Sequence, residues 1–171
     1  RPPHRSMTPD KAVSQAAPPR KRTRGRPTCD CTHGADALLL NARRIFAQRG
    51  FYASSVRQIA EASGVDAALI SHHFGSKEAL WVAVVDQIAA LTRTLIEQTD
   101  ALQHAPLPPA ERIEQAVRVF VEVVFENPDV GMFFSTAATE EGERLDILTQ
   151  RLVRPYPDAM VPLVADWLEA H

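Results

Sequence analysis

The feature that most constrains this chain is a succession of short helices between residues 38 and 80. Apolar residues at helical spacing indicate the first helix, and Gly50 follows it as a stop signal. Ser55 and Gln58 then have the spacing of a capping box, which predicts the start of a second helix. Gly64 stands at the end of that helix, where glycine adopts a left-handed backbone at little cost.

A third helix follows directly. Asp66 is placed to cap a helix from Ala67 to His73, and Ser76 is placed to cap a longer helix that begins at Lys77. Two short helices joined by a tight turn are typical of a helix-turn-helix, whose second helix can lie in the DNA major groove. We therefore expect residues 36–80 to form a DNA-binding domain.

The same stretch resembles the DNA-binding domain of the TetR (tetracycline-repressor) family of bacterial transcription regulators. The resemblance covers about a quarter of the chain and is carried by short motifs in the family's order and spacing. These motifs are Ile45-Phe46, Gly50-Phe51, Ser54-Ser55, Ile59-Ala60, Ala62-Ser63-Gly64-Val65 and His73-Phe74-Gly75-Ser76-Lys77-Glu78-Ala79-Leu80. The resemblance implies an all-α cytoplasmic repressor, with a helix-turn-helix head and a helical body. It also implies a homodimer that leaves a palindromic DNA operator when a small-molecule effector binds.

By the same resemblance, nine residues are expected to contact DNA. They are Ser55, Arg57, Ala67, Ala68, Leu69, Ser71, His72, His73 and Lys77. Ile70 and Phe74 are expected to face the core, and Arg57 and Lys77 to bind phosphates and fix the register. The recognition helix carries Ser71 where many relatives have a tyrosine, and it has no Asn, Gln or Arg for a bidentate contact with a base. Part of the specificity is therefore expected to come from DNA shape and from the N-terminal arm.

The distribution of charge supports a nucleic-acid partner at one end of the chain. Residues 1–35 hold 8 basic and 2 acidic residues (+6), residues 36–80 hold 5 and 4 (+1), and residues 81–171 hold 6 and 15 (−9). These values add up to the net charge of −2. A basic segment joined to an acidic body indicates attraction to phosphates on one side only.

Residues 1–35 are rich in Pro, Arg, Ala, Ser and Thr, which predicts a disordered arm. Its charge is concentrated in Arg20, Lys21, Arg22, Arg24 and Arg26. Ahead of a helix-turn-helix, such an arm can follow the phosphates or place arginines in the minor groove. A solvated tail that only aids solubility is the alternative.

The remaining residues, 81–171, predict a helical body for effector binding and dimerisation, with no competing strand pattern. Helices are expected at 77–100, 110–125, about 128–134, about 145–152 and from 157 onward, with Pro155 ending the fourth. Apolar stripes are predicted on the first (Leu80, Val84, Ile88, Leu91, Leu95), the second (Ile113, Val117, Phe120, Val121, Val124), the fourth (Leu145, Leu148, Leu152) and the last (Met160, Leu163, Val164, Trp167). Family members usually end with two long helices that pair in a four-helix bundle, so this chain is expected to be at least one helix short. The helix from Lys77 is the expected coupler between effector and head.

Other functions are less well supported by the sequence. No catalytic motif is recognisable, so no enzyme activity and no cofactor are expected, and Glu140, Glu141 and Glu143 are interpreted as a solvated polar break. Cys29, Cys31 and His33 leave open a metal-dependent sensor, but a closed zinc site needs a fourth ligand, so free thiols are the preferred interpretation. A regulator without an effector is a further alternative. The cluster Met132-Phe133-Phe134 is equally consistent with an effector pocket and with plain core, and no pocket residue is assigned.

Overall fold

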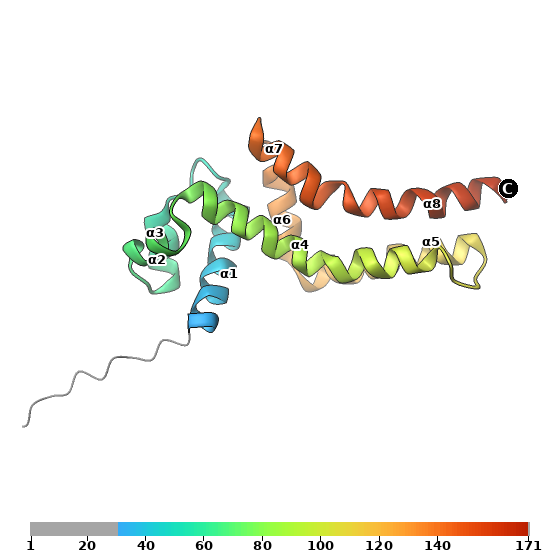
Figure 1. Ribbon diagram of the computed structural model, residues 1–171, viewed down its shortest axis with the longest axis horizontal. Helices are drawn as coiled ribbons and strands as arrows, with labels where there is room; N and C mark the ends of the chain where they lie inside the picture. The colour runs from blue at the N-terminus through green and yellow to red at the C-terminus, as the bar shows by residue number, and fades with distance from the viewer. Residues whose placement is uncertain (1–30, 171) are drawn as a thin grey trace, which may run out of the picture.

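The computed structural model describes residues 31–170, with side chains from Ala35 onward, and these residues form helices without any strand. The helices are α1 (Cys31–Arg49), α2 (Val56–Ser63), α3 (Ala67–Phe74), α4 (Lys77–Leu102), α5 (Pro109–Glu126), α6 (Pro128–Ala137), α7 (Glu143–Leu148), a π-helical segment η1 (Thr149–Val153) and α8 (Pro155–Glu169). The first three helices gather at one end, and α4 runs from them into an elongated body formed with α5 and α8 (Figure 1). The predicted all-α class is confirmed.

Short-range signals set the ends of the head helices as expected. Gly50 follows α1 with a φ of 74°, and Gly64 follows α2 with a φ of 66°. Ser55 and Gln58 form the predicted reciprocal capping box, and Asp66 accepts a hydrogen bond from the backbone of α3. Because each signal acts within about one turn, these boundaries are readable without knowledge of the tertiary structure.

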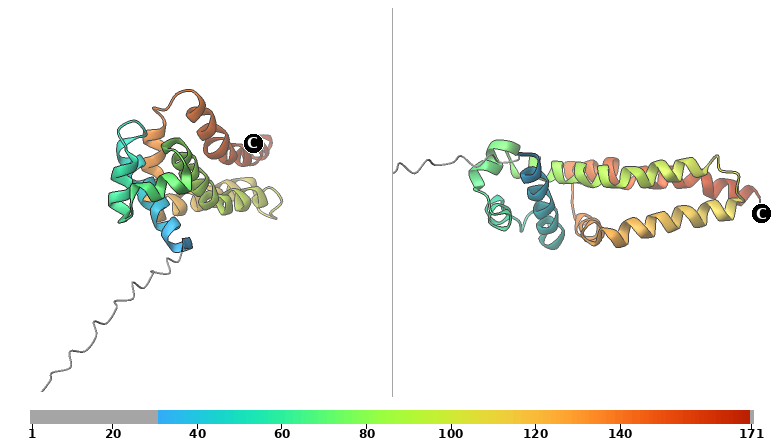
Figure 2. Two further views of the ribbon diagram at one scale, coloured as in Figure 1. Left: turned by 60° about the vertical axis from the view of Figure 1, so that its left-hand side comes forward. Right: turned by 90° about the horizontal axis from the view of Figure 1, so that it is seen from below.

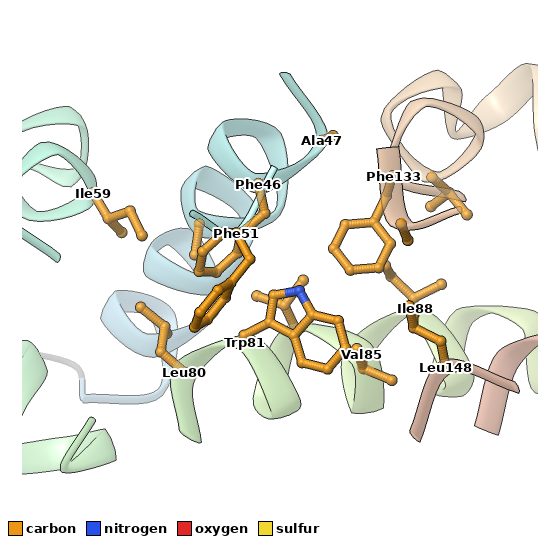
Figure 3. Packing of buried hydrophobic residues seen from close by; sticks show 14 of the residues in the cluster. Phe46, Ala47, Phe51, Ile59, Leu80, Trp81, Val85, Ile88, Phe133 and Leu148 are labelled. Carbon is orange, nitrogen blue, oxygen red and sulfur yellow. The ribbon is translucent and has the colours of Figure 1, made fainter. Parts of the chain in front are cut away.

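The head and the body share one hydrophobic core. The rings of Phe46 and Phe51 are stacked with their centroids 6.1 Å apart. The centroid of Phe51 lies 6.3 Å from that of Trp81, and the centroid of Trp81 lies 6.2 Å from that of Phe133. These aromatic residues connect Phe46 in α1, through Trp81 in α4, to Phe133 in α6 (Figure 3). Helix α1 packs on both α6 and α4, so the head does not depend on α4 alone for its attachment to the body.

The predicted stripe on α4 is largely confirmed. Leu80, Val84, Ile88 and Leu95 are buried, whereas Leu91, which lies between Ile88 and Leu95, is 41% exposed. Among the described helices, α4 alone has the length and apolar composition of a membrane span, and its buried face packs into the protein core.

The expected burial of α5 is wrong. Only Ala116 is buried on this helix, and three of the residues assigned to its buried face, Val117, Phe120 and Val121, are 40–45% exposed. Helix α5 lies at the side of the body against α4, α6 and α8 (Figure 2), and the covered strip is narrower than its apolar stripe.

The segment around Pro155 also differs from the expectation. The fourth expected helix does end just before Pro155, but it consists of α7 followed by η1, in which the backbone N–H of Arg154 donates to the carbonyl oxygen of Thr149 at 2.9 Å, an i→i−5 bond. Pro155 then occupies the first turn of α8, where its missing N–H costs nothing. Leu145, predicted to be buried, is 43% exposed, while Leu148 and Leu152 are buried as expected. In α8 only Leu163 of the predicted stripe is buried, and Val164 and Trp167 are 39% and 36% exposed.

Candidate nucleic-acid interface

Helix α3 presents one face to the core and the other to solvent, as expected for a recognition helix. Ile70 is 1% exposed and Phe74 is half-buried, which anchors the inner face. Ala68, Leu69, Ser71, His72 and His73 are exposed, whereas Ala67 is half-buried and packs against the core. Most of the residues predicted from the recognition helix therefore share one solvent-facing surface.

Leu69 is the largest apolar side chain on this surface. It is 40% exposed, so it is not buried against a neighbouring helix. The ring centroids of His72 and His73 lie 5.9 Å apart at an interplanar angle of 64°, so the two imidazoles are not coplanar. The surface offers methyl and isobutyl groups together with separate single hydrogen-bonding groups.

The two residues expected from α2 and its cap are also exposed. Arg57 is exposed on α2, the helix that packs against α3, and it forms no ion pair within the described chain. The hydroxyl of Ser55 accepts from the backbone N–H of Gln58 at 3.2 Å, so its oxygen already caps α2. The guanidinium of Arg57 is thus available for a phosphate, whereas the hydroxyl of Ser55 stabilises the start of α2.

Lys77 is more deeply engaged than the sequence suggested. Its Nζ donates to the carbonyl oxygens of Phe51 and Ser54, each at 2.9 Å, and lies 4.2 Å from the centre of the Phe51 ring. An ammonium group has three donors, so two of them hold the loop between α1 and α2. A phosphate contact by Lys77 stays a prediction, and it has a single remaining donor.

A cation from the body clamps the same loop. The guanidinium of Arg144, in α7, lies 4.1 Å from the ring centre of Phe51 and 4.7 Å from that of Tyr52. Glu140 accepts from its Nε at 2.6 Å and is itself only 7% exposed, so the interpretation of Glu140 as solvated is wrong. Burial alone would lower the pKa of Arg144, but its hydrogen bonds with Glu140 and Tyr52 raise it overall. Sequence reasoning missed this clamp because its members are distant in the chain.

Two polar contacts join α1 to α6. Nε of Arg43 donates to Asp129 at 2.5 Å, and the Arg43 side chain is only 7% exposed. The hydroxyl of Thr136 donates to the carbonyl oxygen of Ala47 at 2.6 Å. Asp129 lies near the start of α6 and Thr136 near its end, so α6 is attached to α1 at both of its ends.

The body contains a cavity of about 440 Å³ between α4, α5, α6 and the η1–α8 segment. It is lined by Thr92, Leu95, Ile96, Phe120, Val123, Val124, Val130, Gly131, Phe134, Leu152, Val153, Tyr156 and Pro157. Of the aromatic cluster Met132-Phe133-Phe134, only Phe134 lines the cavity, while Phe133 is buried in the core and Met132 is 48% exposed. A volume within the range of about 300–1,000 Å³ is typical of small-molecule sites.

Several predicted residues fall outside these observations. Arg20, Lys21, Arg22, Arg24, Arg26 and Cys29 lie outside the described residues. Helix α1 begins at Cys31, so the last part of the expected arm, including Cys31 and His33, is helical, although these two side chains are not among those described. Within the described part of the chain, no three His, Cys, Asp or Glu side chains are arranged to hold a metal ion.

Together, the capped helix pair, the solvent-facing α3 and the helical body with its cavity define a helix-turn-helix protein with a ligand-sized pocket. Residues 38–84 match the family model of the bacterial regulatory proteins of the tetR family. This region of the chain is therefore similar in sequence to that family.

Curated relatives agree with this assignment. The chain is 33% identical over 72 residues to the HTH-type transcriptional repressor AcnR of Corynebacterium glutamicum, which covers 42% of this chain and 38% of AcnR. It is 36% identical over 102 residues to the HTH-type transcriptional repressor Rv3405c of Mycobacterium tuberculosis, covering 57% and 50%. For the HTH-type transcriptional regulator BetI of Rhizobium meliloti, the values are 32% over 123 residues, 69% and 59%. The matched regions thus span 38% to 59% of the length of these relatives.

Solved structures show the same fold. The hemolysin II transcriptional regulator HlyIIR superposes with a TM-score of 0.66 at 20% identity, covering 81% of this chain and 75% of HlyIIR. The TetR family regulator PfmR from Thermus thermophilus gives 0.65 at 21% identity, covering 80% and 71%. At such identities the likeness concerns the fold.

Proposed function

We propose that this protein is a cytoplasmic transcriptional repressor that binds a palindromic DNA operator as a homodimer and is released from it by a small-molecule effector. The observation that carries the proposal is the exposed face of α3, which the capped turn holds away from the core. Two of the relatives described above are named transcriptional repressors, which supports the same direction of regulation. A regulatory role of this kind requires no catalytic activity.

At the DNA, the chemistry of α3 suits a modest amount of direct base reading. The methyl group of Ala68 and the side chain of Leu69 suit the C5-methyl of thymine, and Ser71 and His72 can each form a single hydrogen bond with a base edge. Arg57, which is exposed on α2, would bind a phosphate and so fix the register of the helix. Basic residues of the N-terminal segment add affinity that depends on salt rather than on sequence.

The effector is proposed to bind in the cavity of the body. Helix α6 contributes Val130, Gly131 and Phe134 to the cavity wall, and it is tied to α1 by the Asp129 ion pair and the Thr136 hydrogen bond. A ligand that displaces α6 therefore acts on the head directly, in addition to any movement of α4. Such a movement would change the spacing of two recognition helices from the roughly 34–36 Å that successive major grooves require.

The coupling between the cavity and the head needs a probe that leaves the core intact. Val85 and Ile88 of α4 are both fully buried, so larger side chains there would disturb the core itself. A better probe is Thr136→Val, which removes the hydroxyl that joins α6 to α1 while keeping the shape. We expect this variant to retain effector binding and to lose part of the effector's influence on DNA affinity. Unchanged coupling would contradict the role of α6.

Selection from a random double-stranded DNA pool at near-physiological salt tests the function itself. A recovered palindrome with half-sites about one helical turn apart is the expected result. The matched variant is His72→Ala, which is expected to relax specificity without unfolding the protein, because His72 is exposed. Binding without enrichment that vanishes as the salt concentration rises would contradict a sequence-specific regulator.

A further inference from the structure

The cavity of the body is lined without a charged side chain. Its walls are aliphatic and aromatic, and the only side-chain hydroxyls among its lining residues belong to Thr92 and Tyr156. No arginine, lysine, histidine or carboxylate from the four enclosing segments lines it. An ionised group placed inside would lose its hydration without gaining a partner.

The two hydroxyl hydrogens are already in use. Thr92 donates to the carbonyl oxygen of Ile88 at 3.2 Å, and Tyr156 donates a long hydrogen bond of 3.4 Å to that of Ala116. The Tyr156 ring stacks on Phe120 at 4.8 Å, and burial raises the pKa of its hydroxyl, so this group remains neutral. What the hydroxyls still offer to a ligand is lone pairs, which accept hydrogen bonds.

We infer that the effector is a neutral, predominantly aliphatic molecule that carries a hydroxyl or a similar uncharged donor, and not a carboxylate or an ammonium. This inference rests on the proposed function for its biological meaning but on the cavity alone for its chemistry. An aliphatic chain gains about 25 cal/mol for each Å² of apolar surface removed from water, and its hydroxyl can donate to a lone pair of Tyr156 or Thr92. A carboxylate has no donor and an unpaired charge, so the same site disfavours it.

The test compares three probes of equal chain length, 1-octanol, octanoate and octylammonium, with the full chain in the absence of DNA. We expect 1-octanol to raise the melting temperature in a concentration-dependent way, and the two ions to have a much smaller effect. Tyr156→Phe is expected to weaken 1-octanol binding by between about twofold and tenfold, the usual effect of losing one net hydrogen bond.

Two further variants show where binding takes place. At Gly131 an added Cβ would meet only Val124, at 3.9 Å, so Gly131→Leu should fill the cavity and abolish the 1-octanol shift. Val153 lines the cavity but is 47% exposed, so Val153→Lys places a cation at the rim without a large folding cost. We expect this variant to be stabilised by octanoate. Val161→Lys, on the exposed face of α8 outside the cavity, is the matched control and should keep the preference for 1-octanol.

Stabilisation of the unaltered protein by octanoate or octylammonium at least equal to that by 1-octanol would overturn the inference. So would an unchanged 1-octanol shift in Gly131→Leu, or the absence of a shift with every probe. Because these measurements contain no DNA, they are independent of the selection experiment. Failure to enrich an operator would contradict the repressor proposal and would leave the chemistry of the cavity as measured.

Discussion

Lys77 and Arg57 are basic residues on α4 and α2, two helices that contact α3, yet they have different physical roles. The ammonium of Lys77 satisfies the carbonyl oxygens of Phe51 and Ser54, two residues that are only 4% exposed. The guanidinium of Arg57 is exposed, and no ion pair of the described chain uses it. Substituting each residue in turn can therefore distinguish a contribution to the stability of the head from a contribution to phosphate binding.

We predict that Lys77→Met lowers stability by about 1–3 kcal/mol, the cost of leaving buried carbonyl groups without partners. For a chain of this length, that loss corresponds to a fall of roughly 2–10 °C in the melting temperature. Arg57→Met should change stability by less than about 0.5 kcal/mol and reduce the salt dependence of DNA binding by about one phosphate contact. Equal melting temperatures for the two variants would show that the Lys77 contacts do not stabilise the loop.

Arg43 and Asp129 form the best-buried ion pair between head and body. Because the Arg43 side chain is 7% exposed, Asp129→Asn leaves a nearly buried cation without its counter-charge. We expect a loss on the order of 3 kcal/mol in urea unfolding, since breaking one side of a buried pair is costly. The double variant Arg43→Met with Asp129→Leu should recover much of that loss because no charge remains buried. A double variant as unstable as Asp129→Asn would contradict this account.

At the scale of the elements, the turn between α2 and α3 depends on the backbone of one residue. Gly64 has a φ of +66°, and an added Cβ would meet no atom within 4 Å, so a side chain there costs strain and not space. Gly131, in α6, has no such φ and its added Cβ would make only an ordinary contact. We predict that Gly64→Ala destabilises by about 1–2 kcal/mol and that Gly131→Ala stabilises by up to about 1 kcal/mol. Thermal unfolding of the two proteins measures both, and a shared sign would refute the argument.

The difference between local signals and long-range contacts explains which elements the sequence could predict. The ends of α2, α3 and the start of α4 depend on caps that lie within a few residues, so their boundaries were readable. The exposure of α5 and the π-helical geometry of η1 depend on which helices pack against them. An apolar stripe alone does not indicate which helix will cover it. For the candidate interface, the outward face of α3 followed from helical periodicity. The engagement of Lys77 by the α1–α2 loop and the Arg144 clamp required contacts between distant parts of the chain.

At the scale of the whole molecule, the head is not an independent unit. The aromatic series from Phe46 through Phe51 and Trp81 to Phe133 crosses from head to body, and the Arg144 clamp and the Arg43 ion pair cross the same boundary. Because α6 contacts the head through these interactions, a displacement of α6 would be transmitted to the head, as the proposed function requires. The arrangement also implies that head and body unfold together.

We therefore predict a single cooperative transition, and Phe133→Ala tests it. Phe133 is 2% exposed, so truncating it should cost about 3–5 kcal/mol and lower the stability of the head as well as of the body. Circular dichroism reports on all helices, and in a Trp167→Phe background the fluorescence of Trp81, the remaining tryptophan of the two, reports on the junction. Coincident transitions that shift together are the expected result.

Phe125→Ala, a truncation of the same size at a residue that is 81% exposed, should shift neither curve appreciably. Two separated transitions, or a Phe133→Ala protein whose Trp81 signal is unchanged while circular dichroism shifts, would show that head and body fold independently.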